Sequence, residues 1–279
     1  MTGSQHSCSE ARPYPVAKWR LIYSPAADGP TNMAVDEAVL HTVGSQESLP
    51  TLRVYRWEPP CLSIGRGQSV QDVDRRALEA AGYDLVRRPT GGRSLLHIDE
   101  LTYSIVVPED DPRVGGGVVE SYRRLSAGLV RGLERLGVAE IVADERAANR
   151  EVEGAVCFEV PSHYEITVGG KKLVGSAQMR AQGVVLQHGA IPLHGDIARI
   201  CPFLTDLPDA TRVRTRATTV ERVLSHRVSW DAAADALVAG LAEALDLTLD
   251  LGHLTAEESA AARELRAGKY TGEAWTTIA

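Results

Sequence analysis

Cysteine and long apolar runs are scarce in this chain of 279 residues, and each scarcity excludes a class of protein. Only four cysteines occur, and no two of them have the spacing of a zinc site or a redox motif. We therefore expect free thiols in a reducing cytoplasm. No stretch approaches the roughly 20 apolar residues of a membrane span, and the polar start is unlike a signal peptide. The sequence predicts a cytoplasmic protein without a membrane anchor.

The chain also lacks an excess of positive charge. Its 30 lysines and arginines are outnumbered by 37 acidic residues, which gives a formal net charge of −7. This balance argues against a nucleic-acid partner and against an anionic membrane, although it permits a local basic pocket. A hydrophobic content of 44% is ordinary for a globular chain with a sizeable core. These features favour an enzyme.

Short strands of mixed spacing alternate with helices along the chain, which indicates an α+β or mixed α/β fold. We expect a helix over residues 29–43 capped by Thr31 or Asn32, and a second one from residue 118 with an apolar stripe. A Thr255–Glu258 capping box opens a third helix. We divide the chain into a flexible tail (1–16), a catalytic domain (17–250) and a helical C-terminal extension (251–279).

The segment "DLVRRPTGGRSLLH" ends a strand with Arg87 and Arg88 and then turns through Gly91 and Gly92. Glycine amides beside arginines form a concavity that suits a phosphate or a developing oxyanion. A surface turn flanked by solvated arginines is the competing interpretation.

The segment "YEITVGGKKLVG" predicts two strands joined by a tight Gly169–Gly170 turn, which sets Thr167 opposite Lys172. Strict alternation then places Lys172 on a polar face with Ser176, whereas Lys171 lies at the turn on the apolar side. Lys172 is therefore the better functional candidate. A solvated outer face of the sheet would explain the same pattern.

Cys157 precedes this hairpin, at the edge of a predicted strand. A thiol becomes a nucleophile as the thiolate, and a nearby ammonium such as that of Lys172 lowers its pKa. His188 is a rival base, and His97 follows the Gly-Gly loop. Both histidines have an alternative interpretation as structural residues.

Five segments in this order resemble the superfamily of lipoate-protein ligase A, biotin ligases and octanoyltransferases, over about residues 17–275: "RWEPPCLSIGRGQ", "RRPTGGRSLLHIDELTYS", "CFEVPSHYEI", "GGKKLVGSAQMR" and "GVVLQHGAIPL". Within it the chain is most similar to the cysteine-dependent octanoyltransferases with a ligase-A-like sequence. The resemblance implies an α+β fold with a large mixed β-sheet flanked by helices, of the biotin/lipoate ligase catalytic-domain type.

The resemblance also implies an acyltransferase of lipoate biosynthesis. Octanoyl would move from octanoyl–acyl carrier protein to a lysine of a lipoyl domain, as in glycine cleavage H protein or the E2 component of 2-oxoacid dehydrogenases. Cys157 would carry the acyl group and Lys172 would be the pocket lysine. No cofactor or metal is expected. Residues expected at the substrate are Arg87, Arg88, Gly91, Gly92, His97, Gly175, Ser176 and His188, with the arginines facing an acidic carrier and the glycine loop and Gly175–Ser176 supplying oxyanion donors.

Two departures separate the chain from ATP-dependent lipoate ligases. Arg93 stands where ligases have a third glycine, and ligases lack a counterpart of Cys157. Three alternatives stay open: an ATP- and Mg-dependent lipoate or octanoate ligase, an amidotransferase that takes octanoyl from H protein, and a non-enzymatic protein that binds carriers.

Overall fold

The computed structural model describes residues 13–144 and 164–278, and the structural statements below concern that part of the chain. Its strands are β1 (Ala17–Tyr23), β2 (Thr51–Tyr55), β3 (Cys61–Ile64), β4 (Asp84–Arg87), β5 (Leu95–His97), β6 (Glu100–Pro108), β7 (Ile141–Asp144), β8 (Glu165–Val168), β9 (Lys171–Ala181), β10 (Val184–Pro192) and β11 (Leu247–Leu251).

The helices are α1 (Gly29–Gly44), α2 (Arg75–Ala80), α3 (Val118–Arg135), α4 (Ala210–Arg216), α5 (Val220–Leu224), α6 (Trp230–Ala244), α7 (Ala256–Leu265) and α8 (Glu273–Thr276). Two 3₁₀ turns, η1 (Val70–Asp72) and η2 (Ile197–Phe203), and a π-helical turn, η3 (Arg266–Tyr270), complete the described elements.

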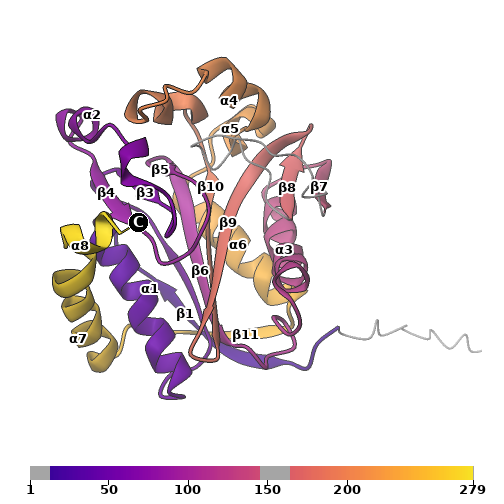
Figure 1. The fold of residues 1–279 in the computed structure, drawn as a ribbon. Helices are drawn as coiled ribbons and strands as arrows, with labels where there is room; N and C mark the ends of the chain where they lie inside the picture. Colours follow the sequence, from indigo (N-terminus) through magenta and orange to yellow (C-terminus); the bar gives the residue numbers. More distant parts are fainter. Residues whose placement is uncertain (1–12, 145–163, 279) are drawn as a thin grey trace, which may run out of the picture.

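An eight-stranded mixed sheet runs through the centre of the molecule in the order β11-β1-β2-β6-β10-β9-β8-β7 (Figure 1). β11, β1 and β2 are parallel, and each later neighbour from β2 to β7 is antiparallel. A separate three-stranded sheet has the order β4-β3-β5. The mixed fold with a large sheet and flanking helices is confirmed, and the small second sheet was not expected from the sequence.

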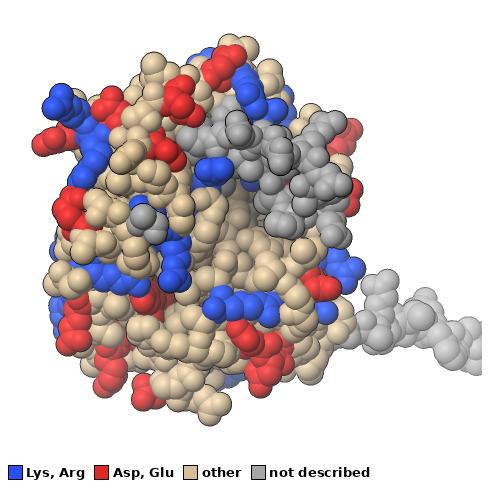
Figure 2. Space-filling model, viewed as in Figure 1, with Lys and Arg blue, Asp and Glu red and all other residues tan. Residues whose placement is uncertain are grey.

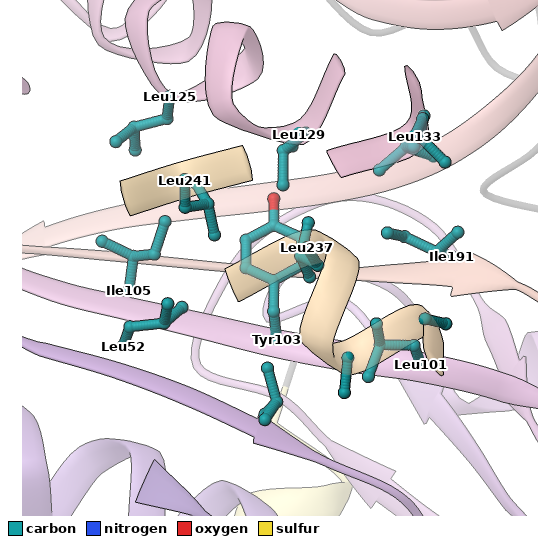
Figure 3. Packing of buried hydrophobic residues seen from close by; sticks show 14 of the residues in the cluster. Leu52, Leu101, Tyr103, Ile105, Leu125, Leu129, Leu133, Ile191, Leu237 and Leu241 are labelled. Carbon is teal, nitrogen blue, oxygen red and sulfur yellow. The ribbon is translucent and has the colours of Figure 1, made fainter. Parts of the chain in front are cut away.

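Helices cover both faces of the large sheet. α3 and α6 pack on one face, where their leucines meet Leu52, Tyr103 and Ile105 of the strands (Figure 3). α1 packs on the opposite face with a second apolar cluster, and α7 lies against α1. The small sheet has its own cluster with η2 and α4. Strand ends and loops from both sheets therefore meet in one region beside α1.

The helix starts follow local sequence. α1 begins after Asp28, whose Oδ1 accepts from the Thr31 amide at 2.8 Å, so the expectation of a Thr31 or Asn32 cap is wrong by three or four residues. Aspartate is the stronger cap because its carboxylate is an ionised acceptor at the positive helix end. The capping box of α7 is present, with the Glu258 amide 3.1 Å from Thr255 Oγ1.

The C-terminal residues lie against the body formed by the large sheet. The boundary drawn at residue 250 falls within β11, which pairs with β1 at the edge of that sheet. Arg20 on β1 holds Glu258 on α7 through two short contacts, Nη2–Oε1 at 2.6 Å and Nη1–Oε2 at 2.8 Å. The bidentate pair is almost fully buried and fastens α7 to the sheet.

No described helix is long and apolar enough to span a membrane.

Candidate active site

A pocket lies where α1, the small sheet and the β9–β10 pair meet. A concave, mostly apolar wall with a few polar groups is typical of small-molecule sites. Most of the wall is apolar or aromatic, and a few polar groups face the space. The lining residues are Met33, Tyr55, Trp57, Ser63, Arg88, Gly92, Leu95, His97, Thr102, Gly175, Ser176, Ala177, His188 and Gly189. Figure 2 shows a hollow on one face of the molecule, with lysine and arginine side chains at its edge.

Six of the residues selected from the sequence line this single pocket, although they come from three separate segments of the chain. They are Arg88, Gly92, His97, Gly175, Ser176 and His188. Gly91 is exposed beside Gly92. Cys157 lies outside the described residues, so its predicted proximity to Lys172 stays a prediction.

Arg87 is elsewhere. It is 0% exposed, and its guanidinium donates to the backbone carbonyls of Gly65, Gln68 and Thr276 at 2.7–2.8 Å. These contacts tie the end of β4 to the C-terminal helix α8. The expectation that Arg87 would face an acidic carrier at the pocket mouth is therefore wrong. Since a strand can end inside a fold, two adjacent arginines need not reach solvent.

Arg88 is also buried, but it faces the pocket. Its Nη2 donates at 2.8 Å to the carbonyls of Gly91 and Arg93, so the guanidinium bridges two carbonyls of the loop that follows it. Its Nη1 lies 3.2 Å from Ser63 Oγ. The exposed cations at this loop are instead Arg93 and Arg66, and the Arg66 amide donates to the Thr90 carbonyl at 2.8 Å.

His97 forms the centre of one polar chain in the pocket wall. Its Nδ1 contacts Glu100 Oε1, and its Nε2 lies 2.8 Å from Ser63 Oγ. The ring stacks on Trp57 with centroids 3.9 Å apart. Thr102 donates to the same Glu100 oxygen at 2.6 Å, and the Trp57 indole donates to Thr102 at 2.8 Å. Both ring nitrogens of His97 are occupied by protein groups.

His188 forms the centre of a second chain. Its Nδ1 lies 3.2 Å from Asp36 Oδ2, and its Nε2 lies 2.6 Å from Thr90 Oγ1. Burial lowers the pKa of His188 below its ordinary value, against the opposing effect of Asp36. The neutral ring then donates from Nδ1 to Asp36 and accepts at Nε2 from the Thr90 hydroxyl.

Asp36 anchors this second chain from inside α1. Burial alone would raise the pKa of the carboxyl, but Arg53 and His188 hold it below its ordinary value. Arg53 Nη1 lies 2.7 Å from Oδ1, and Tyr55 and Ser104 each donate at 2.9 Å. Asp36 was not among the site residues expected from the sequence. An acidic residue in the buried apolar stripe of a helix was the available signal.

Lys172 is where the Gly-Gly turn predicted, on one face with Thr167 and Glu165. Thr167 pairs with Lys172, and the turn glycines have φ of 56° and 73°, as expected. A β-bulge then shifts the register, so that Ile166 faces Val174 rather than Leu173. A bulge adds one residue and reverses the alternation beyond it. The predicted shared face of Lys172, Val174 and Ser176 is therefore wrong.

The reversed alternation separates Ser176 from Lys172. Ser176 lines the pocket but its hydroxyl is 2.8 Å from the Tyr103 hydroxyl, on the face covered by α3 and α6. Lys172 faces the other way and is 4% exposed, with Nζ 3.3 Å from Glu165 Oε1. Lys171 is half-buried, and its Nζ donates to the Arg214 carbonyl at 3.2 Å. The solvated-face interpretation of Lys172 is thus wrong.

Two other cysteines can be placed. Cys61 and Cys201 are free and buried, as expected for incidental thiols. Burial raises the pKa of the Cys61 thiol well above its ordinary value, which makes it a poor nucleophile. Across residues 13–144 and 164–278, no cluster of three or more histidine, cysteine or acidic residues could hold a metal ion.

The sequence and the fold both have close relatives. Residues 28–242 match the lipoyl protein ligase A/B catalytic domain. Octanoyltransferase LipM of Kyrpidia tusciae is 47% identical over 92% of this chain and 97% of its own length. The LipM of Symbiobacterium thermophilum is 44% identical with the same coverage.

Among solved structures, lipoate-protein ligase A bound with ATP superposes with a TM-score of 0.77 and 27% identity, over 94% of this chain and 99% of that one. A putative lipoate protein ligase from T. acidophilum with bound lipoic acid gives a TM-score of 0.75 at 25% identity, with the same coverage of both chains.

Proposed function

This chain belongs to the family of lipoyl protein ligase A/B catalytic domains and is an octanoyltransferase. We propose that it moves octanoyl from a carrier thioester to a lipoyl-domain lysine, and that Cys157 carries the acyl group as a thioester between the two steps. The observation that carries the reaction class is the 47% identity to a named octanoyltransferase over nearly the whole length of both proteins. We place this reaction in the cytoplasm.

The pocket suits an acyl chain that ends in a reactive carbonyl. Met33, Tyr55, Trp57 and Leu95 supply apolar walls, and burial contributes about 0.8 kcal/mol for each CH₂ removed from water. The polar groups gather at the Gly91–Gly92 loop. Within the described residues, the amides of Gly91 and Gly92 have no hydrogen-bond acceptor. Two free amides beside a buried guanidinium suit the oxygen of a tetrahedral intermediate.

The first half-reaction transfers the acyl group to sulfur. The Cys157 thiolate attacks the octanoyl carbonyl, and the tetrahedral intermediate expels the carrier thiolate, which takes up a proton. One thioester replaces another, so the step is close to energetic balance and needs neither ATP nor a metal ion. In the second half-reaction a deprotonated acceptor lysine attacks octanoyl-S-Cys157, the thiolate leaves, and the amine proton passes to a base. The amide product is more stable than the thioester.

Lys172 serves this chemistry as a buried cation with a fixed partner. Glu165 lies 3.3 Å from its Nζ, and both side chains are 5% exposed. An ammonium held in this way can stabilise the thiolate or the oxyanion. The ion pair also holds the lysine side chain in one position. The rotamer entropy that ordering such a long side chain costs is then already lost in the folded protein.

The donor we propose is octanoyl–acyl carrier protein, and the acceptors are lipoyl-domain proteins such as glycine cleavage H protein and the E2 component of 2-oxoacid dehydrogenases. Acyl carrier proteins are acidic as a class. Arg66 and Arg93, exposed on the two adjoining loops, would supply local positive charge in a chain whose net charge is −7.

Intact-mass analysis after incubation with octanoyl–acyl carrier protein tests the scheme. We expect an octanoyl adduct that hydroxylamine removes, that is absent in Cys157→Ala, and that disappears when a lipoyl domain is added. An adduct that persists in Cys157→Ala would contradict the acyl-enzyme. ATP–pyrophosphate exchange driven by free lipoate would instead reveal a ligase, the activity named for the structural neighbours.

A further inference from the structure

The Thr90–Gly92 loop joins β4 to β5 and lines the pocket at Gly92, and its backbone is held in place by its own neighbours. The carbonyls of Gly91 and Arg93 accept from Arg88, and the Thr90 carbonyl accepts from the Arg66 amide. Among the residues that the structure describes, the amides of Gly91 and Gly92 have no hydrogen-bond acceptor, as is also true of the Thr90 amide, and the Gly92 carbonyl has no donor. The position of these amides depends on what fixes Thr90 and Arg88.

Thr90 is fixed from the large sheet and α1. Its hydroxyl meets His188 on β10 at 2.6 Å, and His188 meets Asp36 on α1 at 3.2 Å. Thr90 is 0% exposed and Asp36 is 0% exposed, so water does not compete for these contacts. The Asp36–His188–Thr90 chain therefore links a helix, the central sheet and the loop.

Arg88 is fixed from the small sheet. Ser63 on β3 lies 3.2 Å from its Nη1, and Ser63 in turn is 2.8 Å from His97 Nε2. His97 Nδ1 contacts Glu100 at the start of β6. The Glu100–His97–Ser63 chain thus repeats the order carboxylate, imidazole, hydroxyl on the other side of the same loop.

The occupied ring nitrogens decide what the histidines can do. Each ring contacts a carboxylate through Nδ1 and a hydroxyl through Nε2, and His97 is also stacked on Trp57. A general base needs a nitrogen that faces the substrate proton. Neither ring has one, so both histidines are suited to hold other groups rather than to transfer protons from a substrate.

We propose that His188 and His97 are positioning residues that hold the Thr90–Gly92 loop from two sides, through Thr90 and through Ser63 and Arg88, so that the two free glycine amides meet the carbonyl oxygen of the acyl group. The proposal rests on the acyl transfer proposed above for its kinetic consequence. Its structural part, that the two hydroxyls hold the loop, stands independently of the reaction.

Thr90→Val is the sharpest perturbation because it keeps the shape of the side chain and removes the hydroxyl. We expect kcat to fall by about 10- to 100-fold while KM for octanoyl–acyl carrier protein changes by less than roughly threefold, because displaced oxyanion donors affect the transition state rather than ground-state binding. Ser63→Ala should act in the same way through Arg88. Thr90→Ser, which restores the hydroxyl, should recover most of the lost kcat.

Hydrogen exchange supplies a readout that does not need activity. The Arg66 amide donates to Thr90 and the Arg88 amide donates to Ile64, so both report on the loop. We expect faster exchange at these two amides in Thr90→Val than in Thr90→Ser, with unchanged exchange in α3, which lies on the opposite face of the sheet.

The outcomes separate the two proposals. An active wild-type enzyme whose kcat is unaffected in both Thr90→Val and Ser63→Ala would overturn the positioning role and leave the acyl-enzyme intact. Equal impairment of Thr90→Ser and Thr90→Val would also overturn it. A wild-type protein with no octanoyl adduct would refute the proposed function, and unchanged exchange at Arg66 and Arg88 would then refute the positioning role as well. If Thr90→Val does not fold, Ser63→Ala and Thr90→Ser decide by the same criteria.

Discussion

Replacing Arg53 by methionine should destabilise the fold strongly, because its guanidinium neutralises the buried carboxylate of Asp36. The two side chains are 2% and 0% exposed, and Arg53 Nη1 lies 2.7 Å from Asp36 Oδ1. Arg53 also donates to Asn32 Oδ1 at 2.7 Å and to Ser24 Oγ at 2.8 Å. Arg53→Met therefore removes the strongest partner of Asp36 and three further contacts of its own, the third being to the Asn32 carbonyl.

The expected magnitude follows from these contacts. At 2.7 Å and an effective dielectric constant of about 20, the attraction between the charges is about 6 kcal/mol. Tyr55, Ser104 and His188 remain around Asp36 at 2.9–3.2 Å and offset part of the loss. Removal of one partner from a buried pair costs about 3–5 kcal/mol, and we expect a loss of this size. This loss would be a large share of the free energy of unfolding of a typical domain, which is about 5–15 kcal/mol.

Urea unfolding followed by circular dichroism at about pH 8 measures this loss. Arg75→Met is the matched control, because Arg75 pairs with Glu273 at an exposed site and its loss should have no resolvable effect. The double variant Arg53→Met/Asp36→Asn should be more stable than the sum of the two single losses predicts. A loss below about 1 kcal/mol in Arg53→Met, or strict additivity in the double variant, would refute the reasoning.

Three further predictions address the site and the packing. Burial lowers the pKa of His188 in the folded state, so below about pH 6.5 the unfolded chain binds the proton more readily and the free energy of unfolding should decrease as the pH falls. His188→Gln should remove that part of the pH dependence in urea unfolding. An unchanged pH dependence would contradict the assignment. Lys172→Ala should lower the rate of octanoyl transfer roughly 100-fold and Lys171→Ala much less, measured by mass spectrometry of the acceptor, and the reverse order would contradict the assigned roles. Gly240→Ala should cost about 1–3 kcal/mol of unfolding free energy because its Cβ would lie 2.2 Å from the Gly132 amide nitrogen, whereas Gly268→Ala meets open space and should cost nothing; equal effects of the two changes would refute this packing argument.

The loop after β4 separates this chain from the ligases that share its fold. Arg93 replaces the third glycine of the ligase pattern, and its side chain is exposed while its carbonyl binds Arg88.

Local patterns were sufficient wherever neighbouring residues in the sequence decide the structure. The Gly169–Gly170 turn fixed the pairing of Thr167 with Lys172, because a two-residue hairpin loop has few allowed conformations. The helix from Val118 and the Thr255–Glu258 capping box also follow from short-range spacing. The pocket residues Gly92, His97 and His188 were candidates from their own segments and from the family resemblance, and the pocket lining gives them a common location.

Only the tertiary structure decided which way the polar side chains point and what they meet. The bulge between Ile166 and Thr167 reversed the predicted alternation of β9 beyond Lys172, so that Ser176 turned to Tyr103 while Lys172 stayed beside Glu165. Arg87 and Arg88 are adjacent in sequence, yet one holds the C-terminal helix and the other holds the glycine loop. Asp36 reaches His188 across 152 positions of the chain. Composition and spacing specify short-range geometry, whereas buried charges find partners by proximity in space, which only the packed fold creates.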